Sequence, residues 1–380
     1  MPKFRTRLGV PLVLLVSGLT VGDPAATPSP ALTRLVTAGH APAAALLSET
    51  SGTPRAAGAS GAPGAVRFET TGPAIGRPDH FRAGSVTKTF VATVVLQLAA
   101  EGRLALDDPV AAHAPGLLPP PLDRRVTLRH LLTHTSGLPD LTRPAGPASP
   151  PEGLRAALAS HPPKPSGDFA YSNTNYVVLG RIVEHVTGRS YAAEARRRII
   201  TPLGLTGTSF PGTRTTLPAP HGRGYDSAGR DVTALDPRVA GAAGELVSTL
   251  ADLNRFYTAL LDGRLLPPAQ LDALLDTSSA HGRYGMGLFP TRLPCGVTVW
   301  GHNGRVPGSY VRTAATADGR HVLTFRVNTD TLAAAPGPPL ERSVLEAEFC
   351  PPAAEAAGAG HSGTMSGAPN RAASAVWSSG

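Results

Sequence analysis

The spacing of hydrophobic positions changes twice along the chain. At both ends of the chain, apolar runs are short, rich in Val, Leu and Ala, and bounded by turn-forming residues, which is typical of strands. Between them, longer segments carry apolar residues three or four positions apart, which is typical of helices. The longest of these is 86–101, which Gly102 ends.

The predicted strands and helices therefore form separate groups along the sequence. The pattern predicts strands at 43–49, 65–69, 284–289, 297–300, 309–316 and 322–327, with Asp318-Gly319 as a hairpin turn. It predicts helices at 31–40, 86–101, 127–133, 152–160, 175–186, 191–200, 251–261, 269–275 and 340–349. The simplest architecture is an α/β fold of the α+β type, in which an antiparallel sheet is built from both chain ends. Helices flank this sheet, and a mostly helical sub-domain is inserted between the strands.

The two ends of the chain differ in composition from the rest. Residues 1–31 have the order of a signal peptide: basic residues, the apolar stretch 8–22, then small, turn-prone residues. This stretch is shorter than the ~20 residues of a spanning helix, so we expect a secreted protein with no stable membrane anchor; an uncleaved anchor is the alternative. Residues 351–380, rich in Ala, Gly and Ser, predict a flexible tail. Residues 32–350 remain as the folded domain.

The charge of the chain is basic, but its basic residues are dispersed. The 380 residues have a formal net charge of +8, and 41% of them are hydrophobic, which excludes a wholly disordered chain. No basic run is interleaved with aromatic residues, so we expect a solvated basic surface and no nucleic-acid partner. The pattern gives no indication of an oligomeric state.

The chain has two cysteines, Cys295 and Cys350. Because an exported chain meets an oxidising compartment, we expect one disulfide between them. It would close a loop of about 55 residues and contribute roughly 4 kcal/mol on the chain-entropy model. Two unrelated buried thiols are the alternative.

A candidate nucleophile lies where a predicted strand leads into the longest helix. Ser85 and Lys88 are three residues apart and share a helix face, so the hydroxyl and the amine can meet. A serine hydroxyl needs a base to take its proton, and a lysine enclosed by apolar residues favours its neutral form. The N–H groups at the helix start can act as oxyanion donors. A capping serine with a surface lysine is the alternative.

Two further motifs follow in the sequence. Tyr171-Ser172-Asn173 opens a predicted helix; a tyrosine beside a lysine can serve as a general base, and Asn173 offers a donor and an acceptor to a substrate amide. The segment Gly301-His302-Asn303-Gly304 follows a predicted strand, where glycines let a substrate backbone approach. A capped helix start and a strand-end turn are the respective alternatives.

The chain carries no motif for a cofactor or a metal. His130 and His134 are four residues apart on a predicted helix, but the Glu of a His-Glu-x-x-His zinc motif is missing. No glycine-rich loop for phosphate follows a strand. We therefore expect neither a metal nor a cofactor.

Ser-x-x-Lys, Tyr-x-Asn and His-x-Gly, in this order, resemble the serine penicillin-recognising enzymes. Within that family the chain is similar to secreted D-alanyl-D-alanine carboxypeptidases and class C β-lactamases. Blocks similar to the family are 81–90, 132–138, 171–176, 284–288 and 295–296, so that the resemblance covers residues 32–350. It implies the β-lactamase/transpeptidase-like fold.

The resemblance also implies roles for individual residues. Ser85 is the nucleophile, Lys88 and Tyr171 transfer its proton, and Asn173 contacts the substrate amide. His302 assists from its strand. The backbone N–H groups of Ser85 and of Arg305, which follows Gly304, form the oxyanion hole.

Two departures from the family pattern affect the expected substrate. Asn303 stands where the family has Ser or Thr, whose hydroxyl helps to hold a substrate carboxylate. Phe289-Pro290-Thr291 stand where related carboxypeptidases have a basic stretch, so Arg292 and Arg305 are the candidate carboxylate partners.

The resemblance implies that peptidoglycan stem peptides are hydrolysed through an acyl-serine intermediate and that β-lactams acylate the same serine. A class C-like β-lactamase, a secreted esterase, a D-amino-acid peptidase and a non-catalytic penicillin- or peptidoglycan-binding protein are alternatives on the same fold.

Overall fold

The computed structural model describes residues 27–52, 64–72, 75–140, 154, 158, 167–237, 240–335 and 337–350. The predicted signal sequence up to residue 26, the C-terminal tail and most of the predicted helix 152–160 lie outside these residues.

Six antiparallel strands form the main sheet, in the order β2-β1-β8-β7-β6-β5. The strands are β1 (Ala44–Thr50), β2 (Ala65–Thr71), β5 (Phe289–Arg292), β6 (Thr298–Val306), β7 (Ser309–Ala315) and β8 (His321–Val327). β1, from the start of the chain, pairs along its whole length with β8, from its end. The predicted sheet built from both chain ends is therefore confirmed.

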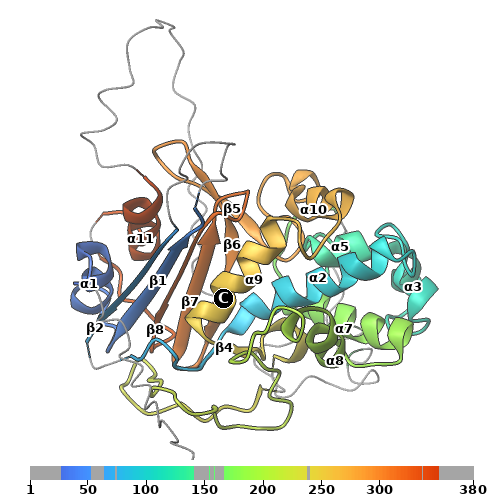
Figure 1. Ribbon diagram of the computed structural model, residues 1–380. Helices are drawn as coiled ribbons and strands as arrows, with labels where there is room; N and C mark the ends of the chain where they lie inside the picture. The colour runs from blue at the N-terminus through green and yellow to red at the C-terminus, as the bar shows by residue number, and fades with distance from the viewer. Residues whose placement is uncertain are drawn as a thin grey trace, which may run out of the picture.

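Helices cover both faces of this sheet (Figure 1). α1 (Pro30–Thr37) and α11 (Leu340–Phe349) lie on one face, and α9 (Leu250–Leu261) lies on the other. In β1, Ala44 and Leu46 join the apolar cluster under α1 and α11, while Ala45 and Leu47 join the larger cluster on the opposite face. Because both faces are covered, β1 reads as an apolar run instead of an alternating one.

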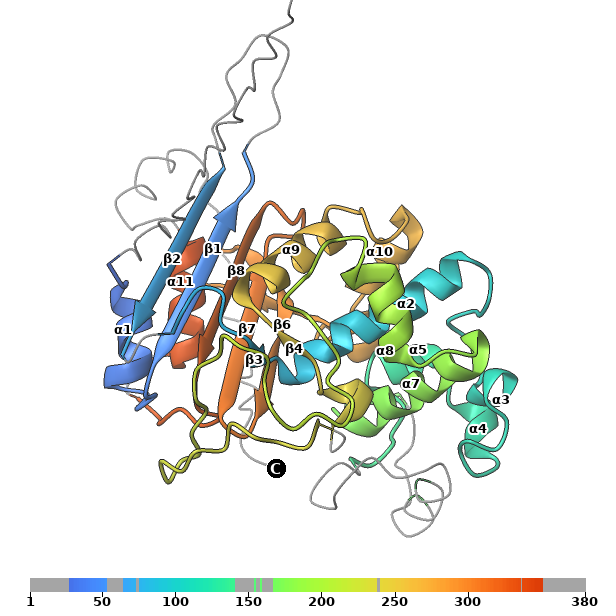
Figure 2. The ribbon, with the colours of Figure 1, turned by 60° about the horizontal axis from the view of Figure 1, so that its bottom comes forward.

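The remaining helices surround α2 (Thr87–Ala100), which leaves the sheet and runs among α7 (Asn173–Thr187) and α8 (Tyr191–Ala195) (Figure 2). α10 (Pro268–Leu275) packs on α2 from another side. α2 is buried at nearly every position up to Leu98, so its apolar residues are spread around the whole helix instead of forming one stripe. Three short helices also lie in this part of the described chain: α3 (Val110–His113), α4 (Leu122–Arg125) and α5 (Leu128–Leu132).

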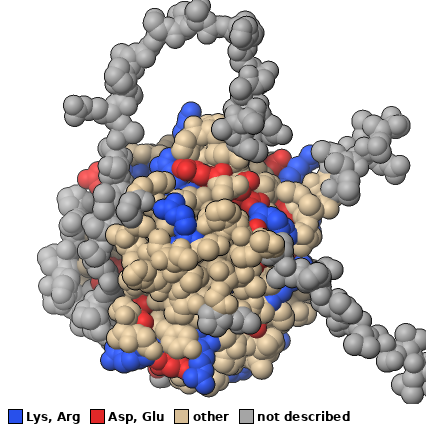
Figure 3. Space-filling view, turned by 90° about the vertical axis from the view of Figure 1, so that its left-hand side faces the viewer, with Lys and Arg blue, Asp and Glu red and all other residues tan. Residues whose placement is uncertain are grey.

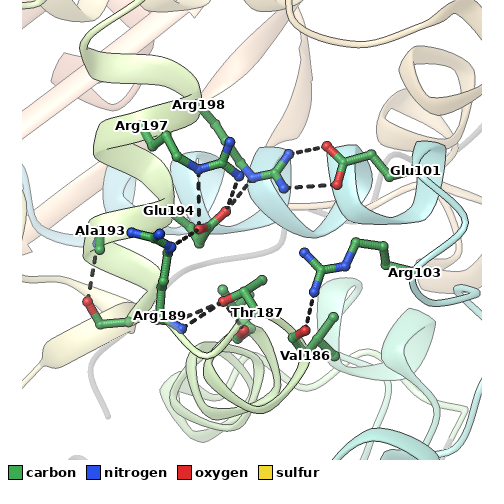
Figure 4. A network of polar contacts seen from close by, with 11 residues as sticks. Glu101, Arg103, Val186, Thr187, Arg189, Ala193, Glu194, Arg197 and Arg198 are labelled. Carbon is green, nitrogen blue, oxygen red and sulfur yellow. Dashed lines mark hydrogen bonds and ion pairs between the residues drawn. The ribbon is translucent and has the colours of Figure 1, made fainter.

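A buried carboxylate joins α8 to the end of α2 (Figure 4). Glu194 is only 1% exposed and accepts hydrogen bonds from Arg197 and Arg198. Arg198 also donates to Glu101, just after α2, at 2.9 Å. Two cations next to one buried carboxylate compensate its lost hydration, and α8 continues through this network as the π-helical segment Arg196–Ile200.

Two predicted strands differ from the observed ones. The strand predicted at 284–289 is wrong, because β5 begins at Phe289. Gly287 has φ +83°, and a Cβ on Gly285 would lie 2.3 Å from the carbonyl oxygen of Leu274. The segment before Phe289 is therefore a tight glycine loop against the helices. In contrast, β6 runs past the predicted end at residue 300 to Val306, so the third motif lies inside a strand.

Cys295 and Cys350 form a disulfide, as predicted. Their Cα atoms are 5.8 Å apart. The bond links the turn between β5 and β6 to the residue that follows α11, and so ties the edge of the sheet to the helix layer.

On the molecular face that Figure 3 shows, groups of Lys and Arg are separated by acidic and uncharged residues. Across the residues that the structure describes, no helix combines the length and hydropathy needed to cross a bilayer.

Candidate active site

Ser85 lies in a single 3-10 turn, Gly84–Val86, between β3 (Phe81–Arg82) and α2. The turn continues directly into α2, so Ser85 stands at the start of a continuous helical segment, as the sequence predicts. Gly84 has φ +52°, a conformation that favours glycine and turns the chain sharply from the strand into the helix.

The third motif contacts this turn through its glycine. β5 pairs with β6 only as far as Gly301, and η1 (Gly84–Val86) packs against the rest of β6. A Cβ on Gly304 would lie 1.9 Å from the carbonyl oxygen of Ala83 and 3.2 Å from the backbone N of Ser85. A Cβ on Gly84 would lie 2.7 Å from the backbone N of Arg305. The two N–H groups expected to form the oxyanion hole therefore lie beside each other.

Lys88 is fully buried, and its amine has three acceptors. Nζ donates to Ser85 Oγ at 3.0 Å, to Asn173 Oδ1 at 2.7 Å and to the carbonyl oxygen of Ala243 at 2.7 Å. Burial lowers the pKa of Lys88 to about 7, although the nearby charge of Asp140 opposes the shift. Close to neutral pH, a large fraction of Lys88 is thus an uncharged amine that can accept the Ser85 proton.

Tyr171 lies next to both Ser85 and Lys88. Lys88 Nζ is 4.9 Å from the centroid of its ring. Burial raises the pKa of Tyr171, and a hydrogen bond with Ser85 partly offsets this. The phenol is therefore protonated at rest, and a phenolate could form only beside a charged Lys88.

Asn173 connects Lys88 to a carboxylate that the sequence analysis did not identify. Its Nδ2 donates to Asp140 Oδ2 at 3.1 Å, while its Oδ1 accepts from Lys88. Asp140 is partly exposed and is near enough to influence the pKa of both Lys88 and Tyr171. Its signal in the sequence is weak: it lies two residues after the 132–138 block, in a segment rich in proline and glycine.

His302 lies on β6 but is occupied by its own neighbours. The side chain is 1% exposed, and its Nε2 is 2.9 Å from the hydroxyl of Tyr284. Nδ1 faces the carbonyl oxygen of Asn303, which can only accept, so Nδ1 carries the proton and Nε2 accepts from Tyr284. Burial and the charge of Lys88 lower the pKa of His302 to about 3. Near neutral pH His302 is therefore an uncharged residue behind Tyr171.

Asn303 points to the opposite face of the sheet, because side chains alternate along a strand. Its amide is 3.5 Å from the hydroxyl of Tyr310, which donates to Glu341 of α11. Arg305 shares this parity and is exposed. The predicted substrate-binding residues thus divide, with Asn173, Gly304 and the Arg305 backbone next to Ser85 and the Asn303 side chain toward the α11 layer.

A buried cation lies near Phe289. The guanidinium of Arg312 is 4.4 Å from the Phe289 ring centroid and forms an ion pair with Glu341 at 2.9 Å. Arg312 is fully buried. Arg312 therefore lies inside the protein and cannot replace the basic stretch that related carboxypeptidases have where this chain has Phe289.

The histidines of the 130–134 pair have separate contacts. His130 Nδ1 accepts from the backbone N of Thr127 and caps α5, whereas His134 Nδ1 accepts from the backbone N of Ser172. Among the described residues, no three His, Cys, Asp or Glu side chains gather as metal ligands would.

Two curated relatives are penicillin-binding proteins by name. "Putative penicillin-binding protein PbpX" of Bacillus subtilis (strain 168) is 28% identical over 251 residues, which are 65% of this chain and 62% of that protein. "Penicillin-binding protein 4" of Amycolatopsis lactamdurans is 32% identical over 298 residues, covering 68% of this chain and 77% of that protein.

Solved structures show the same fold. A D-stereospecific amidohydrolase from Streptomyces sp. has a TM-score of 0.73 and 37% identity, and the match covers 84% of this chain and 98% of that one. The D-amino acid amidase from Ochrobactrum anthropi SV3, complexed with L-phenylalanine amide, has a TM-score of 0.66 and 28% identity over 78% of this chain and 89% of that one. The family described as Beta-lactamase matches residues 28–346. The chain therefore belongs to the β-lactamase family, the serine penicillin-recognising superfamily of hydrolases.

Proposed function

We propose that this chain is a secreted serine amidohydrolase that cleaves the amide bond at the carbonyl of a D-amino acid bearing a free α-ammonium group. Membership of the family supports the acyl-serine chemistry. The names of two structural relatives, a D-stereospecific amidohydrolase and a D-amino acid amidase, support the substrate class. Secretion is proposed from the order of residues 1–31 alone.

The chemistry follows from the contacts of Ser85. Its Oγ attacks the carbonyl carbon while uncharged Lys88 takes the proton, and the carbonyl oxygen lies between the N–H groups of Ser85 and Arg305. Tyr171, protonated at rest, gives its proton to the departing amine and is then reprotonated by Lys88. Water then hydrolyses the Ser85 ester.

The position of the Asp140 carboxylate is the main structural support for this substrate class. Its carboxylate bonds to Asn173, remains partly exposed and lies one side chain away from the lysine amine. A carboxylate in this position attracts a substrate ammonium and repels a substrate carboxylate. The groups that could have bound a substrate carboxylate are engaged elsewhere: the side chain of Asn303 faces Tyr310, and Arg312 is buried against Glu341.

Paired substrates test this proposal. We expect D-phenylalanine amide to be cleaved faster than its L-isomer and faster than N-acetyl-D-phenylalanine amide, which has no α-ammonium group. Asp140→Asn should lower kcat/KM for the free amine at least about 10-fold, because a hydrogen bond to a charged group contributes about 1.5–3 kcal/mol. The N-acetyl substrate should change less than about 3-fold.

Asp272→Asn, an exposed change on α10, is the matched control and should leave both substrates unchanged. An equal effect of Asp140→Asn on the free and the acetylated amide would refute recognition of the ammonium group.

D-alanyl-D-alanine carboxypeptidase activity on peptidoglycan stem peptides is the second candidate. Two relatives that carry the name penicillin-binding protein support this candidate. An N-acylated D-Ala-D-Ala peptide belongs in the same assay. Faster release of D-alanine from it than of ammonia from D-phenylalanine amide, with loss of both activities in Ser85→Ala, would favour the carboxypeptidase.

A further inference from the structure

His134 follows α5 in an unusual backbone conformation. Its φ is +58°, a value that few residues other than glycine adopt, and its side chain is fully buried. Such a conformation costs of order 1–3 kcal/mol and persists only where the surroundings impose it. The contacts of His134 therefore indicate what it does.

Those contacts enclose Tyr171 on both sides. The carbonyl oxygen of His134 accepts from the backbone N of Ala170 at 2.9 Å. Its Nδ1 accepts from the backbone N of Ser172 at 3.2 Å and from Asn175 Nδ2 at 3.0 Å. The residues before and after Tyr171 are thus bonded to one histidine.

The ring of His134 also lies against the ring of Tyr171. Their centroids are 4.2 Å apart at 32°, and the ring of Tyr284 meets His134 edge-on at 4.8 Å. Because Nδ1 accepts two N–H groups, the proton of the neutral ring is on Nε2. Nε2 is buried and has no hydrogen-bond partner among the described residues. Burial and the charge of Lys88 lower the pKa of His134 well below its usual value, which keeps Nδ1 an acceptor.

We propose that His134 is a positioning residue that fixes the hydroxyl of Tyr171 in line with Ser85 and Lys88. It makes no hydrogen bond to Ser85 or Lys88 in the part of the chain described, so it acts through Tyr171. A displacement of about 1 Å at a proton-transfer group can cost 100-fold in rate. The proposal rests on the acyl-enzyme chemistry proposed above and does not depend on which amide is the substrate.

A fluorophosphonate probe reads this chemistry without reference to the substrate. Ser85 Oγ forms a bond to phosphorus, the P–F bond breaks, fluoride leaves, and the Ser85 proton passes to uncharged Lys88, with Tyr171 hydrogen-bonded to Ser85. Labelling must occur in the wild type and vanish in Ser85→Ala. If it does not, the acyl-serine function fails independently of His134.

Two variants separate the acceptor from the ring. His134→Leu removes both, and we expect labelling about 100-fold slower. His134→Asn keeps an acceptor for Ser172 and tolerates a positive φ, so labelling should slow only about 3- to 10-fold. His281→Leu controls for backbone strain, because His281 has φ +52° on the exposed surface; it should label at the wild-type rate.

The same changes made in Tyr171→Phe test whether His134 acts through the tyrosine. Tyr171→Phe has no hydroxyl to position, so adding His134→Leu or His134→Asn to it should slow labelling by less than about 3-fold further. Equal slowing in both backgrounds, or a wild-type rate in a folded His134→Leu, overturns the proposal. If His134→Leu does not fold, His134→Asn decides alone, and a wild-type rate for it also overturns the proposal.

Discussion

At the residue scale, the site depends on one buried lysine. Three acceptors surround Lys88 Nζ, yet burial lowers its pKa to about 7, so the amine changes charge in the range where the enzyme would work. His302 and Tyr171 cannot supply this titration, because the pKa of His302 falls to about 3 and that of Tyr171 is raised. The pH dependence therefore identifies the proton acceptor.

We expect kcat/KM for an uncharged ester substrate to rise about tenfold per pH unit below pH 7 and to level off above it, since only neutral Lys88 accepts the proton. A steady-state profile between pH 5 and 9 measures this. Lys88→Ala should be slower by about 10²–10⁴-fold and should lose the inflection. A flat wild-type profile across this range would exclude Lys88 as the acceptor.

The same shift affects stability with a definite sign. Between pH 7 and the ordinary value of 10.5, unfolding lets Lys88 bind a proton that the folded chain excludes. The unfolded state then binds more protons, so this group makes the free energy of unfolding rise with pH, by at most about 1.4 kcal/mol per unit. Urea unfolding at pH 7 and 9 should show a smaller rise in Lys88→Met than in the wild type.

Motif spacing predicted which residues would meet, but not where each side chain points. Ser85 and Lys88 share a helix face, so their contact follows from helix geometry alone. The orientation of Asn303 follows from the parity of β6, which depends on a register with β7 that the sequence does not reveal. The role of Asp140 could not be predicted from the sequence, because only the tertiary fold brings it into contact with Asn173.

At the scale of elements, burial explains the correct predictions, and close packing of glycines explains the wrong one. Apolar periodicity located α2, α9 and the sheet strands, because burial decides their sequences. The strand predicted at 284–289 is instead a loop, since its glycines contact helix backbone that is distant in sequence. The spacing of hydrophobic residues along the sequence gives no information about such contacts.

Gly304 is the sharpest test of this packing. In Gly304→Ala, the new Cβ would lie 1.9 Å from the carbonyl oxygen of Ala83, which must push β6 away from η1 and displace the N–H of Arg305. We expect fluorophosphonate labelling to fall about 100-fold or more. In Gly222→Ala, where the nearest atom would be 3.7 Å away, labelling should not change. Normal labelling of Gly304→Ala would remove Arg305 N from the oxyanion hole.

At the scale of the whole molecule, the first and last elements that the structure describes lie together and close the fold. α1 and α11 pack on the same sheet face, and the disulfide holds the end of α11 to the β5–β6 turn. This arrangement was predictable in outline, because strands at both ends of a chain must find partners in one sheet. The start of the folded domain was not, since it depends on contacts between α1 and β2.

Those contacts predict where the mature chain begins. Ser29 caps α1 by accepting from the backbone N of Leu32, and its own N–H donates to Glu69 at 2.8 Å. Glu69 is 2% exposed and Leu32 is fully buried, so removing Ser29 would leave a buried carboxylate without this donor and would cost about 1–3 kcal/mol.

We therefore expect protein from culture medium to begin at or before Ser29, within residues 22–29, instead of at the 31/32 boundary that composition suggests. Intact-mass measurement and N-terminal sequencing of the secreted protein decide this. Ser29→Ala should lower the melting temperature, whereas Thr37→Ala at the exposed end of α1 should change it little. A mature protein that starts at Leu32 and melts at the same temperature as a longer one would show that the cap contributes nothing to the fold.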